Sequence, residues 1–278
     1  MDTNCKSIQE RREDCPNSLY HYTDLNALKG IIKEKKLVFW GTRFDSMNDP
    51  LDYTFAANII IPKILSYLNQ LQGLKDEETD YNEMYPYSVS FSENEDDESM
   101  WTHYGSEVAL EIDTRFFYPL YNLNETIKFW FDKCLYVNEV DITDEFINSC
   151  LNDFPSDNIP SRVQYASAFI KRDAFARENE WRMFSADYKT GYCDADGTFY
   201  RTEIPNGIKV ATVRDKDLIL YKEFELPSEA LKGIIINDCD VSHFHKVKSH
   251  IQLLLKANGF SSEKINIRQT KNYPLDKK

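Results

Sequence analysis

Long apolar runs are missing from this 278-residue sequence. One run of three isoleucines, at residues 59–61, ends at Pro62, and Leu37–Trp40 ends at Gly41, whereas a helix that crosses a bilayer needs about 20 apolar residues. Residues 1–17 are polar and charged, so they also lack the apolar stretch of a secretory signal. We therefore expect neither a membrane span nor a membrane partner.

Glycine and closely spaced cysteines are also scarce. None of the 9 glycines belongs to a glycine-rich phosphate loop. The 6 cysteines are scattered without a Cys-x-x-Cys pair, which is typical of reduced thiols in the cytoplasm and not of disulfides or a zinc site. Gly-x-Ser-x-Gly and His-Glu-x-x-His are absent as well. We therefore predict a cytoplasmic protein with no metal cofactor and without these two hydrolase signatures.

Negative charge and aromatic side chains are abundant. The 46 acidic residues outnumber the 33 Lys and Arg residues, for a net charge of −13. Such a surface disfavours non-specific binding of nucleic acid. Apolar residues make up 42% of the chain and aromatic residues 14%, which is enough for a hydrophobic core and excludes intrinsic disorder.

Helical and strand periodicities are mixed along the chain. Leu25, Leu28 and Ile31 predict an amphipathic helix over residues 24–34, and the alternation from Tyr87 to Ser92 predicts a half-buried strand. We expect further helices over 62–71, 141–152, 161–177 and 241–258, and further strands near 37–40, 108–112, 134–137, 207–213, 218–225, 232–236 and 264–267. Because these elements do not alternate strictly, we predict an α+β fold with a central mixed, mainly antiparallel sheet and flanking helices. Residues 1–17 are interpreted as a polar lead-in, and 18–278 as a single domain.

Three segments combine polar groups with large aromatic side chains. The first, Tyr20–Thr23, places His21 at a strand-to-helix corner, where it can bind a hydroxyl group or move a proton. The alternative is a buried histidine that donates to a backbone carbonyl. The second, Trp101–Gly105, follows an acidic loop and offers aromatic rings for stacking, or else forms a packed aromatic corner.

The third segment is Glu178–Arg182. If it is extended, Glu178, Glu180 and Arg182 share one face while Trp181 points toward the core. Two neighbouring carboxylates repel each other, so partial burial would raise the pKa of one of them. The alternative is an exposed strand with a Glu–Arg pair that contributes less than about 1 kcal/mol.

These segments resemble a known bacterial family. Runs similar to Leu19–Thr23, Phe44–Pro50, Ser90–Ser92, Met100–Gly105 and Glu178–Arg182 occur in this order in domain-of-unknown-function family 2971. The resemblance spans roughly residues 19–240. It implies no activity, because the family has none established.

The order of elements also resembles, more distantly, ADP-ribosyltransferase-like folds. This resemblance implies that NAD is the substrate, that His21 binds its ribose, that Glu180 is the catalytic carboxylate and that Glu178 orients the acceptor. Such a carboxylate stabilises the oxocarbenium-like state in which an N-glycosidic bond breaks. The resemblance further implies a stacking ring from Tyr22 or Tyr104, a pyrophosphate contact from Arg43, Lys171, Arg172 or Arg182, and cofactor contacts from Thr23, Ser90, Trp101 and His103.

We therefore predict an NAD-using ADP-ribosyltransferase or NAD glycohydrolase, of the kind that serves phage defence or acts as a toxin, with an acceptor macromolecule that the sequence does not identify. The first alternative is a non-catalytic module that senses a nucleotide or another small ligand. The second is a metal-dependent hydrolase or nuclease that uses Asp96, Asp97, Glu178 and Glu180. Nicotinamide release distinguishes the transferase from the sensor, and metal dependence identifies the hydrolase.

Overall fold

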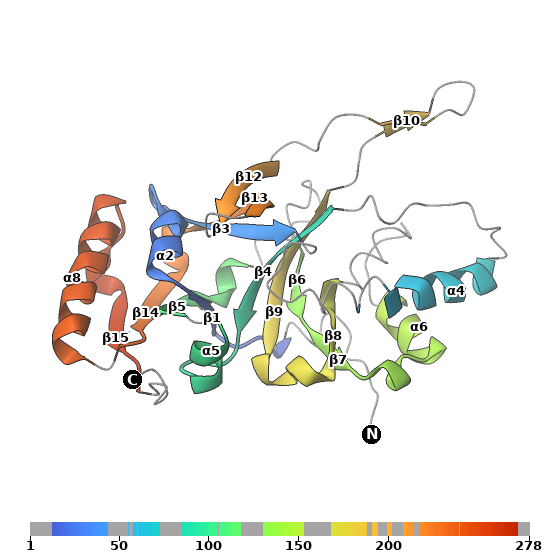
Figure 1. Cartoon of the computed structure of the whole chain (residues 1–278), viewed down its shortest axis with the longest axis horizontal. Coiled ribbons are helices and arrows are strands. Elements are labelled where there is room, and N and C mark those ends of the chain that lie inside the picture. Colours follow the sequence, from blue (N-terminus) through green and yellow to red (C-terminus); the bar gives the residue numbers. More distant parts are fainter. Residues whose placement is uncertain are drawn as a thin grey trace.

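The structure is a computed structural model (Figure 1). It describes residues 13–43, 55, 58–59, 61–72, 85–104, 106–117, 130–152, 168–187, 191–193, 199–201, 208–213, 217–238 and 240–271. The Asn48-Asp49-Pro50 part of the family resemblance therefore lies outside the described residues. Within those residues, no helix is long and apolar enough to cross a membrane.

The strands are β1 (Ser18–Thr23), β2 (Ile32–Lys33), β3 (Lys36–Arg43), β4 (Tyr85–Ser92), β5 (Val108–Asp113), β6 (Trp130–Lys133), β7 (Leu135–Val137), β8 (Ile170–Arg172), β9 (Glu180–Asp187), β10 (Gly191–Cys193), β11 (Phe199–Arg201), β12 (Ile208–Val213), β13 (Asp217–Pro227), β14 (Leu231–Ile236) and β15 (Asn266–Gln269). The α-helices are α2 (Leu25–Ile31), α4 (Ile61–Gln72), α5 (Glu98–His103), α6 (Asp144–Asn152) and α8 (Val241–Ala257). The 3-10 helices are η4 (Thr114–Phe116), η6 (Glu139–Asp141), η7 (Asp173–Glu178), η8 (Ser228–Ala230) and η9 (Ser262–Lys264).

An 11-stranded sheet organises the molecule, with strand order β12-β13-β3-β4-β1-β5-β14-β15. Strand β2 joins β3, while β9 pairs with both β4 and β6. The β14–β15 pair is parallel and the other pairs of this sheet are antiparallel. The predicted α+β class with a mixed, mainly antiparallel sheet is therefore confirmed. In Figure 1, α2 and α8 lie at one end of this sheet, and α4 and α6 lie beyond its other end.

The sheet forks at β4. One edge of β4 is taken by β9 along its full length, from Tyr85 to Ser92. Its other edge therefore receives two strands: β3, through Thr42 and Arg43, and β1, through Tyr20. Between these two contacts, Nδ1 of His21 donates to the carbonyl oxygen of Ser90 over 2.9 Å. The histidine thus gives a hydrogen-bond partner to a backbone group where the two neighbouring strands separate.

The surroundings of His21 match the structural alternative, not the ribose-binding role. Its ring packs against Phe39 at 5.1 Å and Phe91 at 5.5 Å between centroids. Burial lowers the pKa of His21, although its hydrogen bond to Ser90 opposes this effect. We conclude that His21 is a neutral histidine that donates to a backbone carbonyl.

Strand registers divide this region into a core face and a polar face. Tyr20 is paired with Ser92, and Ser92 with Glu180, so these three side chains share the polar face. His21 and Phe91 alternate with them and lie on the core face. There they join a cluster that includes buried residues of α2 and α8, among them Leu28 and Ile251.

The predicted helix over 161–177 is interrupted by a strand in its described part. Ile170–Arg172 forms β8, which pairs in parallel with β7, and η7 follows it. The apolar pair Phe169 and Ile170 fits either periodicity, and the long-range pairing with β7 decides between them. The predicted strand near 134–137 is confirmed as β7, and Cys134 separates it from β6. Residues 98–103, which we did not predict as a helix, form α5.

We predict that His21→Phe lowers the free energy of unfolding by about 1–3 kcal/mol at neutral pH, because the Ser90 carbonyl loses its donor. This deficit should narrow as the pH falls below about 6.5, since unfolded His21 then binds a proton that the folded environment disfavours. Urea unfolding of both proteins at about pH 7 and about pH 5.5 measures the effect. The exposed His250→Phe is the control. A deficit that stays constant with pH would contradict a neutral buried His21.

Candidate functional site

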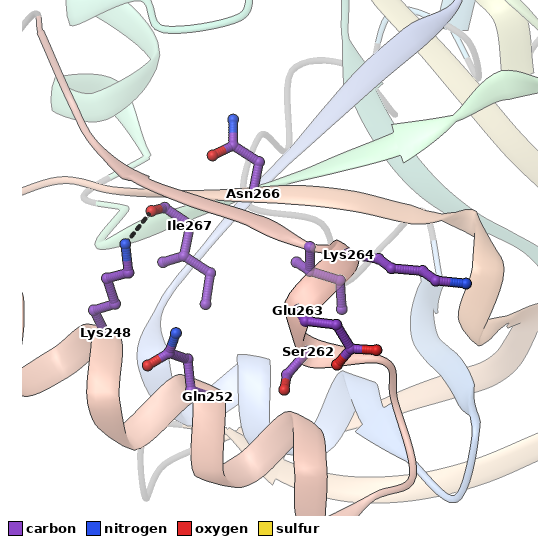
Figure 2. A pocket seen from close by; sticks show the side chains of 8 residues that line it. Lys248, Gln252, Ser262, Glu263, Lys264, Asn266 and Ile267 are labelled. Atoms are coloured by element: carbon purple, nitrogen blue, oxygen red, sulfur yellow. Dashed lines mark hydrogen bonds between the residues drawn. The ribbon is translucent and has the colours of Figure 1, made fainter.

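The first surface hollow to consider lies between α8 and β15 (Figure 2). Its volume is about 330 Å³. Lys248, on its wall, donates its ammonium group to the carbonyl oxygen of Ile267 over 3.0 Å. None of the predicted site residues lines it, and its polar lining contains no aromatic ring. The candidate site therefore lies elsewhere.

The candidate site is a cluster of charged side chains at the start of β9, beside the end of β4. Asn179, with φ of 44°, ends η7 in a left-handed conformation immediately before β9. This turn places Glu178 and Glu180 on either side of one residue. The hydroxyl of Ser92 donates to the backbone carbonyl of Glu178 over 2.6 Å and fixes the turn against β4.

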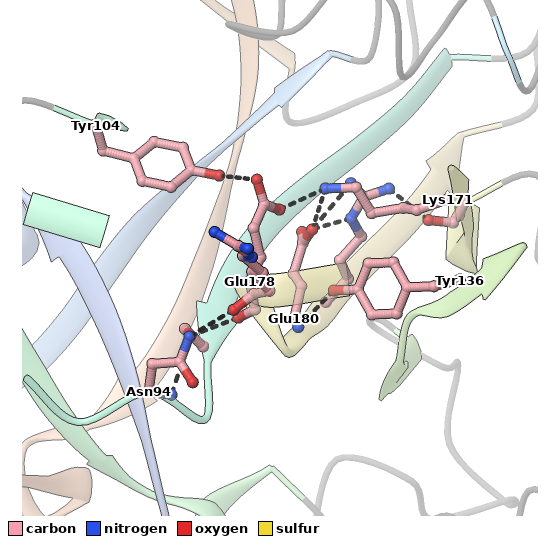
Figure 3. Close-up of polar contacts among 10 residues, drawn as sticks. Asn94, Tyr104, Tyr136, Lys171, Glu178 and Glu180 are labelled. Atoms are coloured by element: carbon pink, nitrogen blue, oxygen red, sulfur yellow. Dashed lines mark hydrogen bonds and ion pairs between the residues drawn. The ribbon is translucent and has the colours of Figure 1, made fainter. Parts of the chain in front are cut away.

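One ammonium group joins the two glutamates (Figure 3). Nζ of Lys171 donates to Oε2 of Glu178 over 2.7 Å and to Oε2 of Glu180 over 2.6 Å. On the other side of Glu180, Nε of Arg182 donates to Oε1 over 2.6 Å. We call Lys171, Glu178, Glu180 and Arg182 the charged cluster.

The charged cluster is buried and electrically balanced. Its two cations compensate its two anions, and the side chain of Arg182 is only 1% exposed. Burial alone would raise the pKa of Glu180, but Arg182 and Lys171 together outweigh it and hold that pKa well below its usual value. The expectation that repulsion raises a carboxylate pKa is therefore wrong for Glu180, because a lysine lies between the two acids.

Two tyrosines complete the site. The hydroxyl of Tyr104, which follows α5, donates to Oε1 of Glu178 over 2.6 Å. Burial of this group, together with the charge of Glu178, raises the pKa of Tyr104. The residue is nevertheless 38% exposed, so an accessible aromatic ring is tied to a buried carboxylate. The hydroxyl of Tyr136 accepts from the backbone N–H of Glu180 over 2.8 Å.

Tyr22 and Trp101 hold the neighbouring acidic loop and form a packed corner. The hydroxyl of Tyr22 donates to the carbonyl oxygen of Asn94 over 2.7 Å, and its ring meets Trp101 edge-on at 4.7 Å. Trp101 is fully buried, and its Nε1 donates to Asp96 over 2.8 Å. The packed-corner alternative therefore describes Trp101, whose ring is not accessible for stacking.

The remaining predicted residues do not all converge. Ser90 pairs with Arg182 and shares the polar face with Tyr22 and the two glutamates. His21, Thr23 and Arg43 lie on the core face. Thr23 is two positions from His21 and Arg43 four positions from Phe39, and residues an even number apart on a strand share one face. These three residues therefore lie on the opposite face of the sheet from the charged cluster, and the ligand contacts implied for them stay predictions. His103 is the last residue of α5, and its side chain lies outside the description, as does Gly105.

The acids of the metal-dependent alternative are engaged in other contacts. Asp97 caps α5 by accepting from the N–H of Met100 over 3.0 Å, and Asp96 also accepts from the hydroxyl of Thr270 over 2.6 Å. The two glutamates accept from lysine and arginine. Within the described part of the chain, no three His, Cys, Asp or Glu side chains form a group that could hold a metal ion.

Sequence reasoning did not identify the bridging role of Lys171 or the contacts of Tyr136 and Ser92. Lys171 precedes the two glutamates by 7 and 9 positions, whereas side chains that touch along one helix are 3 or 4 positions apart and those on one face of a strand are an even number apart. Neither local geometry accounts for contact with both glutamates. The left-handed turn at Asn179 brings the three together. Nothing in the local sequence signals that turn beyond the tolerance of asparagine for a positive φ.

The comparison with known families tests the predicted family resemblance. Residues 100–183 match the family described as Protein of unknown function (DUF2971). The predicted resemblance to this family is confirmed over that segment, which contains the whole charged cluster and Tyr104. No curated protein and no solved structure matches the chain. The likeness to ADP-ribosyltransferase-like folds stays a prediction.

We predict that Lys171→Met lowers the free energy of unfolding by about 3–5 kcal/mol at neutral pH, because two buried carboxylates then face each other. In the wild type, the stabilisation from Glu180 is present above about pH 4.5 and is lost as the pH falls, since its folded pKa is lowered. The deficit of the variant should therefore shrink in acid. Urea unfolding over this pH range measures both effects.

Lys36→Met is the matched control for this prediction. Lys36 also pairs with a glutamate, Glu225, at 2.7 Å, but both side chains are exposed, so its loss should change the unfolding free energy by less than about 1 kcal/mol. An equally small change for Lys171→Met would show that the charged cluster does not hold this part of the fold together.

Proposed function

We propose that the polar face at Tyr104 binds a small nucleotide-type ligand, and that the protein senses this ligand without cleaving it. The single observation that carries the proposal is the accessible ring of Tyr104, fixed through its hydroxyl to the buried Glu178. A ring held in place before binding loses little conformational entropy when a ligand base stacks on it.

Hydroxyl-binding groups lie beside this ring. Glu178 accepts from Tyr104 through Oε1, and the second lone pair of this oxygen can accept from a ligand hydroxyl while the tyrosine stays in place. Ser90 is half-buried on the same face and can donate or accept. A flat base attached to a hydroxyl-rich sugar fits such a set of partners, and this chemistry favours a nucleotide.

Charge balance favours sensing over turnover. A carboxylate speeds cleavage of an N-glycosidic bond by stabilising positive charge that develops on the sugar. Both oxygens of Glu180 already accept from Lys171 and Arg182, whose charges compensate it. Glu180 therefore stabilises a positive charge on the ligand only weakly unless one of these ion pairs opens.

NAD cleavage is the second candidate, and one observation favours it. Glu178 and Glu180 lie side by side with Tyr104 at one site, in the arrangement that the transferase-like resemblance implies. In this version NAD is the substrate, Glu180 stabilises the developing charge and Glu178 orients the acceptor. His21, Thr23 and Arg43 take no part.

We predict that Tyr104→Ala weakens NAD binding by about tenfold or more, because a stacked base is worth roughly 1–3 kcal/mol. Tyr104→Phe keeps the ring and should bind within about threefold of the wild type. Isothermal titration calorimetry with NAD measures both affinities, and melting curves check the fold. The exposed Val140→Ala is the control. If the well-folded wild type binds no NAD at millimolar concentration, the proposed function is wrong.

A turnover assay separates the two candidates. We expect wild-type protein to bind NAD without releasing nicotinamide. Release that falls by about 10²–10⁴ in Glu180→Gln would instead establish cleavage, because that substitution removes about 3–5 kcal/mol of transition-state stabilisation. Melting curves are essential, since Glu180→Gln also leaves Lys171 and Arg182 partly uncompensated.

A further inference from the structure

The aromatic ring of the proposed ligand site is carried by a helix that is too short to hold its own position. α5 has 6 residues, Glu98–His103, and Tyr104 is its C-cap. Isolated helices shorter than about 12–15 residues are only marginally stable in water, so α5 is oriented by its contacts with the rest of the protein. The same contacts therefore decide where the ring of Tyr104 lies.

Trp101 is the residue that holds α5 against the sheet. It is fully buried and packs in one cluster with Tyr20, Ala109 and Ile235, which belong to β1, β5 and β14. An indole ring has a single hydrogen-bond donor, Nε1–H. In Trp101 this group donates to Oδ1 of Asp96 over 2.8 Å. The orientation of the central residue of α5 thus depends on one carboxylate.

Asp96 connects Trp101 to the C-terminal end of the sheet. Its side chain is only 9% exposed. Oδ1 also accepts from the hydroxyl of Thr270 over 2.6 Å, and Oδ2 accepts from the backbone N–H of Lys271 over 2.8 Å. The guanidinium group of Arg268 lies 3.9 Å from Oδ2. A buried carboxylate is therefore shared between the α5 helix and the segment that follows β15.

Thr270 is itself fixed to the sheet. It directly follows β15, and its backbone N–H donates to the carbonyl oxygen of Ile236, the last residue of β14, over 2.9 Å. The side chain of Gln269 donates to the carbonyl oxygen of Asp238 over 2.7 Å. The donors that hold Asp96 thus have their own positions set by β14 and β15.

The loop that contains Asp96 also holds the turn that carries Glu178. Nδ2 of Asn94 donates to the carbonyl oxygen of Arg177, the residue before Glu178, over 2.7 Å. Two positions further along the loop, Asp96 holds α5. Both partners of the hydrogen bond between Tyr104 and Glu178 are therefore positioned by this one loop.

We propose that Asp96 is a positioning residue of the ligand site, and that through Thr270 it makes ligand binding at Tyr104 depend on the C-terminal end of β15. This inference rests on the proposed function and adds to it the group that holds the ring in place before the ligand binds. If that group is loosened, the ring must be ordered during binding, and the entropy cost of this ordering weakens the affinity.

The test replaces Thr270 with valine in the full-length protein, which removes the hydroxyl group and keeps the shape of the side chain. The backbone N–H groups of Trp101 and Tyr104 donate within α5, to Asp97 and Met100. We expect Thr270→Val to speed their hydrogen exchange by about threefold or more and to weaken NAD binding by about three- to tenfold. Thr270→Ser keeps the hydroxyl group and should restore both. NMR-detected hydrogen exchange and isothermal titration calorimetry measure the two effects.

Thr114→Val is the matched control. The hydroxyl of Thr114 also donates over 2.6 Å to a distant acceptor, the carbonyl oxygen of Pro16, but this bond joins η4 to the segment before β1. Exchange in α5 and NAD affinity should therefore stay within about twofold of the wild type.

Two results would overturn this inference alone. One is unchanged exchange of the α5 amides in a well-folded Thr270→Val, and the other is unchanged NAD affinity despite faster exchange. No NAD binding by the wild type would instead overturn the proposed function, and with it the role of Asp96 in ligand binding. The exchange rates would then still decide whether Asp96 positions α5.

Discussion

The ammonium group of Lys171 is the interaction on which the candidate site depends. It separates two buried carboxylates and at the same time connects β8 to η7 and β9. Through Glu178 and Tyr104 the connection reaches the end of α5. Buried ion pairs add little net stability compared with apolar side chains of similar size, because desolvation offsets the attraction. Their effect here is on geometry, since any other arrangement of these elements would leave a buried charge without its partner.

The sheet has a core face and a polar face at the fork of β4, and the two faces have different roles. On the core face, His21, Phe39 and Phe91 fill the point where β1 and β3 leave the same edge of β4. On the polar face, serines alternate with these aromatic residues and lie beside the charged cluster. Successive side chains of a strand point to opposite faces. A shift of one residue in the register of β1 would therefore move His21 to the polar face and Tyr20 to the core face.

The same alternation of side chains between the two faces of a strand explains what could be predicted from the sequence. The alternation of Tyr87, Val89 and Phe91 with serines predicted the two faces of β4, and Glu180 and Arg182 were correctly placed on the face opposite the buried Trp181. Glu178, in contrast, lies in η7 and not in an extended segment. The face of His21 could not be predicted, because it depends on the pairing of Tyr20 with Ser92, 72 positions away. Nor could β8 be distinguished from a helix, since the apolar pair Phe169 and Ile170 suits both, and only the pairing of β7 with Ile170–Arg172 decides between them. Local patterns therefore predicted elements and alternation, whereas long-range pairing decided which side chains meet.

The relative strengths of two interactions favour binding at this site over catalysis. A ligand hydroxyl that donates to the second lone pair of Oε1 of Glu178 adds a hydrogen bond to a charged group, and such bonds contribute about 1.5–3 kcal/mol each. A ligand cation that is to benefit from Glu180 must first separate it from Lys171 or Arg182, and opening a buried pair costs about 3–5 kcal/mol. The cost of opening the pair is comparable to the about 3–5 kcal/mol by which a catalytic carboxylate would stabilise the transition state. Catalysis at Glu180 therefore requires a ligand group that takes over the role of Lys171 or Arg182, whereas recognition at Tyr104 leaves every buried charge of the cluster paired.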